Sequence, residues 1–105
     1  IMPLTVPPST SRHAWHLFIV RLDTEKAGMS RNRFMEKLKK RNIGTGLHFR
    51  AVHEQHYYRT TMPHVMKTLP NTEWNSGRIC SLPLFPAMTT DDVDAVVQSI
   101  REVLG

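Results

Sequence analysis

Between positions 89 and 104 the hydrophobic and polar residues alternate with the period of an α-helix. The apolar positions are Val93, Val96, Val97, Ile100, Val103 and Leu104. Thr89 is a typical N-cap residue, and Asp91 and Asp92 in the first turn suit the positive end of the helix dipole. The pattern therefore predicts an amphipathic helix whose apolar stripe packs on a sheet.

A second amphipathic helix is predicted between Ser30, its N-cap, and Arg41. Its apolar stripe consists of Phe34, Met35 and Leu38. The cations that lie outward or in its last turn, where they suit the helix dipole, are Lys37, Lys39, Lys40 and Arg41. Asn42 and Gly44 are expected to end this helix.

Residues 14–22, AWHLFIVRL, are rich in aromatic and β-branched side chains and are predicted to form a strand. One face carries Trp15, Leu17 and Ile19, and the other carries His16, Phe18, Val20 and Leu22. A strand that is apolar on both faces is expected to be covered on both sides. A domain of this size supplies one covering layer of helices easily and a second with difficulty.

The remaining predicted elements are short. Residues 43–49 are expected to form a second strand, and residues 81–86 a brief strand that proline confines to a sheet edge or a strand end. Short helices or turns are expected at 53–59 and 72–79, with a loop at 63–70. The order of elements predicts an α+β fold, a small mixed or antiparallel sheet with helices packed mainly on one face.

The first twelve residues carry prolines and small polar side chains without periodicity. We expect residues 1–12 to be an extended linker from a larger domain, and residues 13–105 to form one domain. A start at Ile1 rather than at methionine also suggests a piece of a longer protein.

The 105 residues carry a formal net charge of +5, which favours anionic partners. Cys80 is the only cysteine, which excludes an intrachain disulfide and favours a reducing compartment. No apolar run approaches the roughly 20 residues needed to span a bilayer, and the first residues show no signal-peptide pattern. We therefore expect a cytoplasmic protein that does not associate with membranes.

Residues 43–59, IGTGLHFRAVHEQHYYR, combine two glycines, three histidines, two arginines and three aromatic residues. Gly44 and Gly46 allow close backbone approach or a positive φ. His48 and Arg50 would then project where the predicted strand ends in a loop, which favours a ligand-facing role. The side chains expected to point into the core instead are Leu47 and Phe49.

Two other functions are considered. A metal site could use His48, His53 and His56, although the histidines of HEQH are spaced i and i+3 rather than the i and i+4 of zinc proteases. A nucleic-acid-binding module could use the basic helix at 30–41 with the aromatic residues Phe49, Tyr57 and Tyr58. For Cys80, a small buried hydrophobic role is favoured over an activated thiolate.

Four segments together resemble the DegT/DnrJ/StrS family of sugar aminotransferases. They are HAWHLFIVRLD at 13–23, IGTGLHFRAVHEQHYYR at 43–59, LPNTEWNS at 69–76 and ICSLPLFPAMTTDDVDAVV at 79–97. The resemblance implies aminotransferase fold type I, in which a large domain binds pyridoxal 5'-phosphate through a lysine. A smaller C-terminal α+β domain closes over the substrate at a dimeric active site. This chain is expected to be that smaller domain, with the large domain of the same protein as its partner.

The resemblance assigns substrate binding to His48, Arg50 and His53, facing a nucleotide sugar and 2-oxoglutarate or glutamate. It implies amino transfer from glutamate to a UDP-linked 4-keto pentose, for the aminoarabinose modification of lipid A and resistance to cationic peptides such as polymyxin. No catalytic, cofactor-binding or metal-binding residue is assigned within this chain. Its lysines, Lys26, Lys37, Lys39, Lys40 and Lys67, are expected on a hydrated helix face or in loops, so the fragment alone should be inactive.

Overall fold

The structure is a computed structural model that describes residues 1–64 and 68–105. The elements are β1 (Met2–Pro3), β2 (Phe18–Arg21), α1 (Thr24–Ala27), α2 (Arg31–Lys39), η1 (Val52–Glu54), α3 (His56–Thr61), α4 (Pro70–Ser76), β3 (Ile79–Leu82) and α5 (Thr90–Leu104). Part of the loop predicted at 63–70, including Lys67, lies outside the described residues. Among the described residues, no helix has the length and apolar character needed to cross a bilayer.

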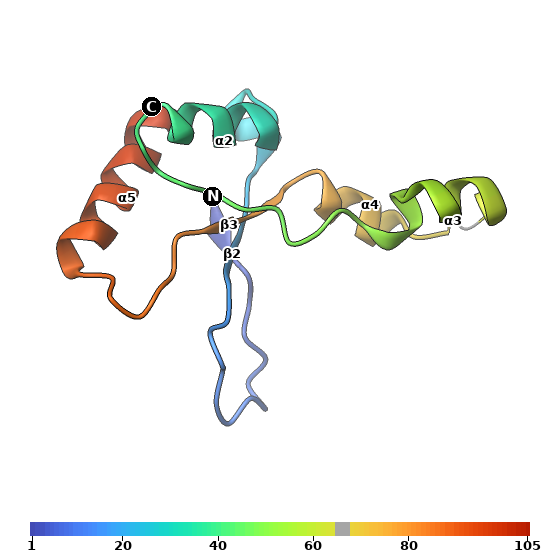
Figure 1. The fold of residues 1–105 in the computed structure, drawn as a ribbon, viewed down its shortest axis with the longest axis horizontal. Helices are drawn as coiled ribbons and strands as arrows, with labels where there is room; N and C mark the ends of the chain where they lie inside the picture. The colour runs from blue at the N-terminus through green and yellow to red at the C-terminus, as the bar shows by residue number, and fades with distance from the viewer. Residues whose placement is uncertain (65–67) are drawn as a thin grey trace.

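The three strands form one antiparallel sheet in the order β1-β2-β3, which confirms the α+β prediction (Figure 1). Val20 pairs with Cys80, and Ile19 pairs with Ser81. Gly46 forms an isolated bridge on the outer side of β3, with hydrogen bonds of 3.0 and 2.8 Å between its backbone and that of Ser81. The sheet is therefore extended at this edge by a single residue.

Both predicted amphipathic helices are present, and they lie on the same side of the sheet (Figure 1). Ser30 caps α2 by accepting a hydrogen bond from the backbone N–H of Arg33, and Thr89 and Asp92 form a capping box at α5. The buried hydrophobic core consists of Val20, Leu22, Phe34, Leu38, Cys80, Val96, Ile100 and Val103. Two residues of the predicted apolar stripe of α5 are not buried, since Val93 and Val97 are 45% and 39% exposed.

The molecule is open in shape. Its radius of gyration is 15.7 Å, compared with about 13 Å for a compact domain of this length. Figure 1 shows α3 and α4 extending away from the sheet, on the side opposite α5. Because neighbouring residues of a strand point to opposite faces, Ile19 and Ser81 face away from the core that contains Val20 and Cys80. Neither α2 nor α5 packs on this second face, so within this chain the strand that was expected to be covered on both sides has its helical layer on one face only.

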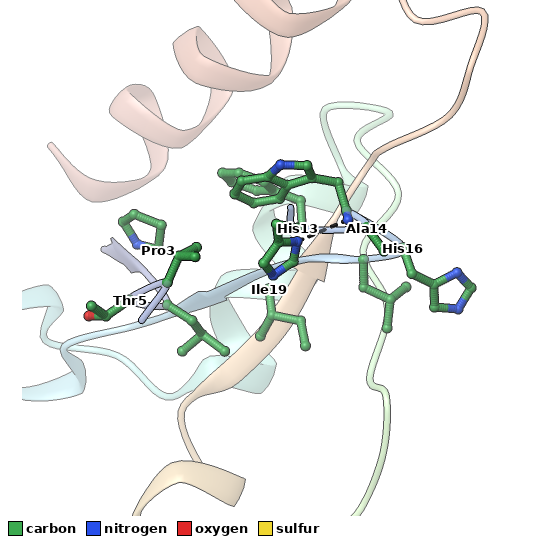
Figure 2. Close-up of a pocket in the computed structure, with 11 residues that line it drawn as sticks. Pro3, Thr5, His13, Ala14, His16 and Ile19 are labelled. Carbon is green, nitrogen blue, oxygen red and sulfur yellow. Dashed lines mark hydrogen bonds between the residues drawn. The ribbon is translucent and has the colours of Figure 1, made fainter. Parts of the chain in front are cut away.

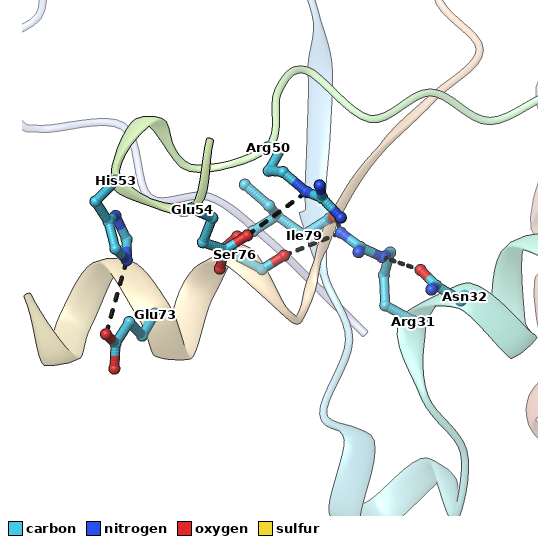
Figure 3. Close-up of polar contacts among 8 residues, drawn as sticks. All are labelled: Arg31, Asn32, Arg50, His53, Glu54, Glu73, Ser76 and Ile79. Carbon is cyan, nitrogen blue, oxygen red and sulfur yellow. Dashed lines mark hydrogen bonds and ion pairs between the residues drawn. The ribbon is translucent and has the colours of Figure 1, made fainter. Parts of the chain in front are cut away.

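α4 is joined to the sheet by cation–π and hydrogen-bond contacts. The guanidinium groups of Arg21 and Arg78 lie 4.9 and 4.5 Å from the ring of Trp74. Arg31 of α2 donates hydrogen bonds of 3.0 and 3.1 Å to the carbonyl oxygens of Ser76 and Ile79 (Figure 3). These contacts fix the start of the projecting arm that α3 and α4 form.

The predicted strand at 14–22 is shorter in the structure, because β2 begins only at Phe18. Trp15 has a φ of +48°, a left-handed conformation that a strand does not accommodate, and its ring stacks on Phe18 and packs at a tilt against His13. Figure 2 shows the apolar pocket beside this turn. The predicted linker also differs at its start, since Met2 pairs with Arg21 in the sheet. The domain division at 12 and 13 stays a prediction.

The strand predicted at 43–49 is wrong, because only Gly46 pairs with the sheet. Once the chain leaves the sheet, the alternation of faces is lost, and Leu47 and Phe49 are 37% and 76% exposed rather than buried. The other short elements exist with shifted bounds. The helix expected at 72–79 is α4, and the strand expected at 81–86 is β3, which ends before Pro83.

Candidate functional site

His48 lies over the uncovered face of the sheet. Its Nδ1 is 2.9 Å from Oγ of Ser81, whose side chain points to that face and is 5% exposed. The imidazole itself is exposed. The aromatic ring of Phe49 packs edge-on against it, with ring centroids 5.2 Å apart. The side chain is therefore held at one ring nitrogen and available to a ligand elsewhere.

Gly46 makes this position possible. A Cβ atom at residue 46 would lie 2.4 Å from Cε1 and 3.0 Å from Nδ1 of His48. Carbon atoms in contact are normally about 3.5–4.0 Å apart, so only glycine leaves room for the ring. The expectation of close approach is thus confirmed at Gly46. At Gly44 an added Cβ would meet nothing within 4 Å, and its φ is not positive.

A pocket of about 290 Å³ lies beside His48. Its polar lining side chains are His16, Thr45, His48 and Ser81. His16 precedes β2, whereas His48 follows the bridge at Gly46, so the pocket joins segments that are distant in sequence. The interpretation of residues 14–22 as a strand assigned His16 to an apolar face and missed its place in this pocket. The available signal was a histidine within an apolar run.

The other two predicted substrate-binding residues do not line this pocket. Arg50 is exposed, with its Nε 3.9 Å from a carboxylate oxygen of Glu54 (Figure 3). His53 is only 4% exposed, and its Nε2 is 3.7 Å from a carboxylate oxygen of Glu73 in α4. A distance of 3.7 Å is too long for a hydrogen bond. The structure thus places the side chain of His53, in η1, against α4 and outside the pocket that His48 lines.

The three-histidine metal site is not formed. Within residues 1–64 and 68–105, no group of three or more His, Cys, Asp or Glu side chains is arranged to hold a metal ion. His53 is buried against α4, whereas His48 lies on the sheet and His56 is exposed at the start of α3. The i, i+3 spacing of the last two histidines is not enough, because His53 and His56 belong to different short helices.

Three of the six Lys and Arg residues at 30–41 make contacts within the protein, which weakens the nucleic-acid interpretation. Arg31 donates to backbone carbonyls of the α4–β3 connection, Arg33 pairs with Glu36 at 2.9 Å, and Arg41 pairs with Glu102 at 3.2 Å. Engaged guanidinium groups contribute less to phosphate binding than free ones. Figure 1 also shows α3, which carries the tyrosines, far from α2. The two tyrosines therefore do not share a surface with the basic helix.

Cys80 is a core residue, as favoured from the sequence. It is 2% exposed, and burial raises the pKa of its thiol to about 11, against a smaller opposing effect of the Arg31 charge. The thiol is therefore protonated at neutral pH, and a protonated thiol is a poor nucleophile.

The fold and this site define a class of protein, a small α+β domain with one uncovered sheet face and an imidazole presented on it. The sequence matches the DegT/DnrJ/EryC1/StrS aminotransferase family over residues 1–101. The chain belongs to this family.

Two solved structures share the fold. They are the apo form and the PMP form of Spr1654 from Streptococcus pneumoniae, described as a candidate sugar aminotransferase. The TM-scores are 0.80 and 0.81, and the sequence identities are 21% and 22%. Each match covers 97% of this chain but 25% of the Spr1654 chain. The chain thus spans about a quarter of the length of these proteins, and at this identity the likeness concerns the fold alone.

Aminotransferases of this family use pyridoxal 5'-phosphate, so the described lysines are candidates to hold it. Lys26 pairs with Asp23 at 3.9 Å, and its side chain is 88% exposed. Lys39 and Lys40 are exposed at the end of α2, and Lys37 is half-buried on the same helix. Lys26 shares an open surface pocket with Asp23, and Lys39 shares another with Glu36, but both side chains are exposed rather than enclosed as a cofactor-binding lysine must be. The described residues therefore do not fit a cofactor cradle.

Proposed function

We propose that this chain is the small, substrate-side domain of a pyridoxal-phosphate-dependent sugar aminotransferase and is inactive alone. The observation that carries the proposal is His48, whose exposed imidazole is fixed by Ser81 on the uncovered face of the sheet. Membership of the aminotransferase family supports it. The absence of a fitting lysine among the described residues supports a second, larger domain of the same protein as the holder of the cofactor.

The proposed substrates are anionic. The reaction transfers an amino group from glutamate to a UDP-linked 4-keto pentose, as in UDP-4-amino-4-deoxy-L-arabinose:oxoglutarate aminotransferase, in support of lipid A modification and polymyxin resistance. The net charge of +5 suits such substrates. His48 and the exposed Arg50 contact the nucleotide sugar or 2-oxoglutarate, while His53, the third residue proposed for the substrate side, is buried against α4.

The proposal also covers the domain contacts, the oligomeric state and the cellular compartment of the complete protein. The uncovered sheet face, with Ile19 and the hydrogen-bonded Ser81, meets the larger domain of the same protein. The complete protein acts as a homodimer in the cytoplasm. A sheet face that carries an aliphatic side chain and an aromatic neighbour at its edge is typical of surfaces that are covered in the complete protein.

The test is His48→Ala in the full-length protein, with glutamate and the UDP-linked 4-keto pentose as substrates. Loss of a hydrogen bond to a charged ligand costs about 1.5–3 kcal/mol, so kcat/KM should fall by about 10- to 100-fold. Because His48 is exposed, the free energy of unfolding should change by no more than about 1 kcal/mol. His64→Ala, which removes another exposed histidine, is the matched control.

Equal kcat/KM values for His48→Ala, His64→Ala and the unchanged protein would remove His48 from the site. A full-length protein that transfers no amino group from glutamate to any keto sugar would refute the proposed activity itself.

A further inference from the structure

The pocket beside His48 has a chemical character that the family resemblance did not assign. Its polar groups are the imidazoles of His16 and His48 and the hydroxyls of Thr45 and Ser81, and its apolar walls are Leu17, Leu82, Pro83 and Leu84. Among the described residues that line it, there is no carboxylate. Imidazole N–H and hydroxyl groups donate hydrogen bonds, and the absence of lining carboxylates leaves an anion without a repelling neighbour.

Both imidazoles can reach a ligand. His16 and His48 are exposed, and they come from two segments that the structure brings to one pocket. His16 also lines the neighbouring apolar pocket, and Figure 2 shows its imidazole directed away from Pro3 and Thr5 of that pocket. The strand prediction placed His16 on a sheet face, but β2 begins at Phe18, so His16 lies outside the sheet.

Ser81 determines which nitrogen of His48 meets the ligand. Its Oγ lies 2.9 Å from Nδ1, and a hydroxyl can donate to a bare Nδ1 or accept from a protonated one. When the hydroxyl donates, the proton of the neutral ring resides on Nε2. When the ring is charged, Nε2 also carries a proton. In these two states Nε2 presents an N–H donor, whereas a neutral ring that donates from Nδ1 to Ser81 leaves Nε2 bare, so Ser81 acts on the ligand through the tautomer and is a positioning residue.

The size of the pocket limits what it holds. Ligand pockets usually measure about 300–1,000 Å³, and this one is about 290 Å³. It can therefore receive one group of a substrate rather than a whole nucleotide sugar. We propose that this pocket binds an anionic group of the substrate, a carboxylate or a phosphate, through His16 and His48. This assignment rests on the proposed function, because it takes the uncovered sheet face to be the substrate side.

The test uses the full-length protein with ¹³C-labelled histidine imidazoles, so that the six histidines of the chain report separately. Inorganic phosphate is titrated in one series and acetate in another. The signals of His16 and His48 should shift together and saturate with one dissociation constant, while those of His56 and His64 stay in place. Saturation by phosphate alone identifies a phosphate of the nucleotide as the natural occupant, and saturation by acetate alone identifies a carboxylate of the acid co-substrate.

Two variants extend the test. His16→Gln should weaken binding of the same anion by about 10-fold, the loss of one charge-assisted hydrogen bond, and His64→Gln should leave it unchanged. Ser81→Ala should change the tautomer of His48, seen in its ¹³C shifts, without removing the ring. Signals that do not saturate, or that shift equally for all exposed histidines, would overturn the subsite.

Failure of the subsite can be separated from failure of the proposed function. If the full-length protein transfers amino groups and His48→Ala impairs it, but neither anion saturates the two signals, the subsite is wrong and the function stands. If the protein transfers no amino group, the function is wrong, whichever result the histidine signals give.

Discussion

Replacing Gly46 by alanine tests how the site is built. The new Cβ would lie 2.4 Å from Cε1 of His48, whereas contacting carbon atoms stay about 3.5–4.0 Å apart. The imidazole must therefore move by more than about 1 Å. Because the ring is exposed and the φ of Gly46 is not positive, the side chain can yield while the backbone keeps its conformation.

The expected effect on stability is small. Displacing the ring breaks the hydrogen bond between His48 and Ser81, which costs about 1 kcal/mol. Alanine in place of glycine reduces the freedom of the unfolded chain and stabilises the fold by about 0.4–1 kcal/mol. The two effects nearly cancel, so the free energy of unfolding of Gly46→Ala should lie within about 1 kcal/mol of the unchanged protein. The effect on substrate should be larger, at least about 10-fold in kcat/KM, because a displacement of about 1 Å misplaces a contacting group.

Urea unfolding gives the first quantity, and steady-state kinetics of the full-length protein give the second. Gly77→Ala is the matched control, since its added Cβ would meet nothing within 4 Å and its φ is −76°. Unchanged kinetics of Gly46→Ala would mean that the position of His48 does not matter to the substrate. A loss of several kcal/mol in stability would mean that the backbone, rather than the imidazole, gives way.

Three further predictions concern the thiol, the helix cap and the lysines. Because burial raises the pKa of the Cys80 thiol to about 11, the native protein should react with a thiol reagent about 100-fold more slowly than the unfolded protein near pH 8; equal rates would contradict this burial. Thr89→Ala should destabilise the protein by about 1 kcal/mol in urea unfolding. Hydrogen bonds from the backbone and then the hydroxyl of Thr89 lower the pKa of Asp92, so the cap stabilises the fold above the ordinary pKa of that carboxyl and is lost as the pH falls through the lowered value. The stability gap between Thr89→Ala and the unchanged protein should accordingly shrink in acid. Finally, the chain mixed with pyridoxal 5'-phosphate and borohydride should show no stoichiometric lysine adduct by mass spectrometry, and such an adduct would refute the proposal that a second domain holds the cofactor.

Local patterns predicted the helices well because their signals are local. The side chains of Ser30 and Thr89 each accept a hydrogen bond from the backbone N–H three residues later in the sequence. Such a cap depends only on neighbouring residues and can therefore be predicted from the sequence. The buried positions Phe34 and Leu38 follow from helical spacing alone. The strand at 14–22 was only partly correct, since the left-handed conformation of Trp15 has no signature in its apolar neighbours.

The candidate site was predictable only in part. His48 stood out because it follows two glycines and was expected to project where the predicted strand ends in a loop. Its partner Ser81 could not be found from the sequence, because the two residues are 33 positions apart and meet only through the bridge at Gly46. The expected grouping of His48 with His53 differs from the structure, since a helical turn at η1 buries His53 against α4.

The sequence by itself determined the α+β class, both long helices with their caps, the single buried cysteine and the apolar excess of the central strand. Each of these follows from spacing or composition within a short window. Only the tertiary structure decided that Met2 pairs with Arg21, that one residue of the 43–49 segment joins the sheet, and that His16 and His48 line one pocket. Such pairings depend on contacts between distant segments, whose free energy no local pattern records.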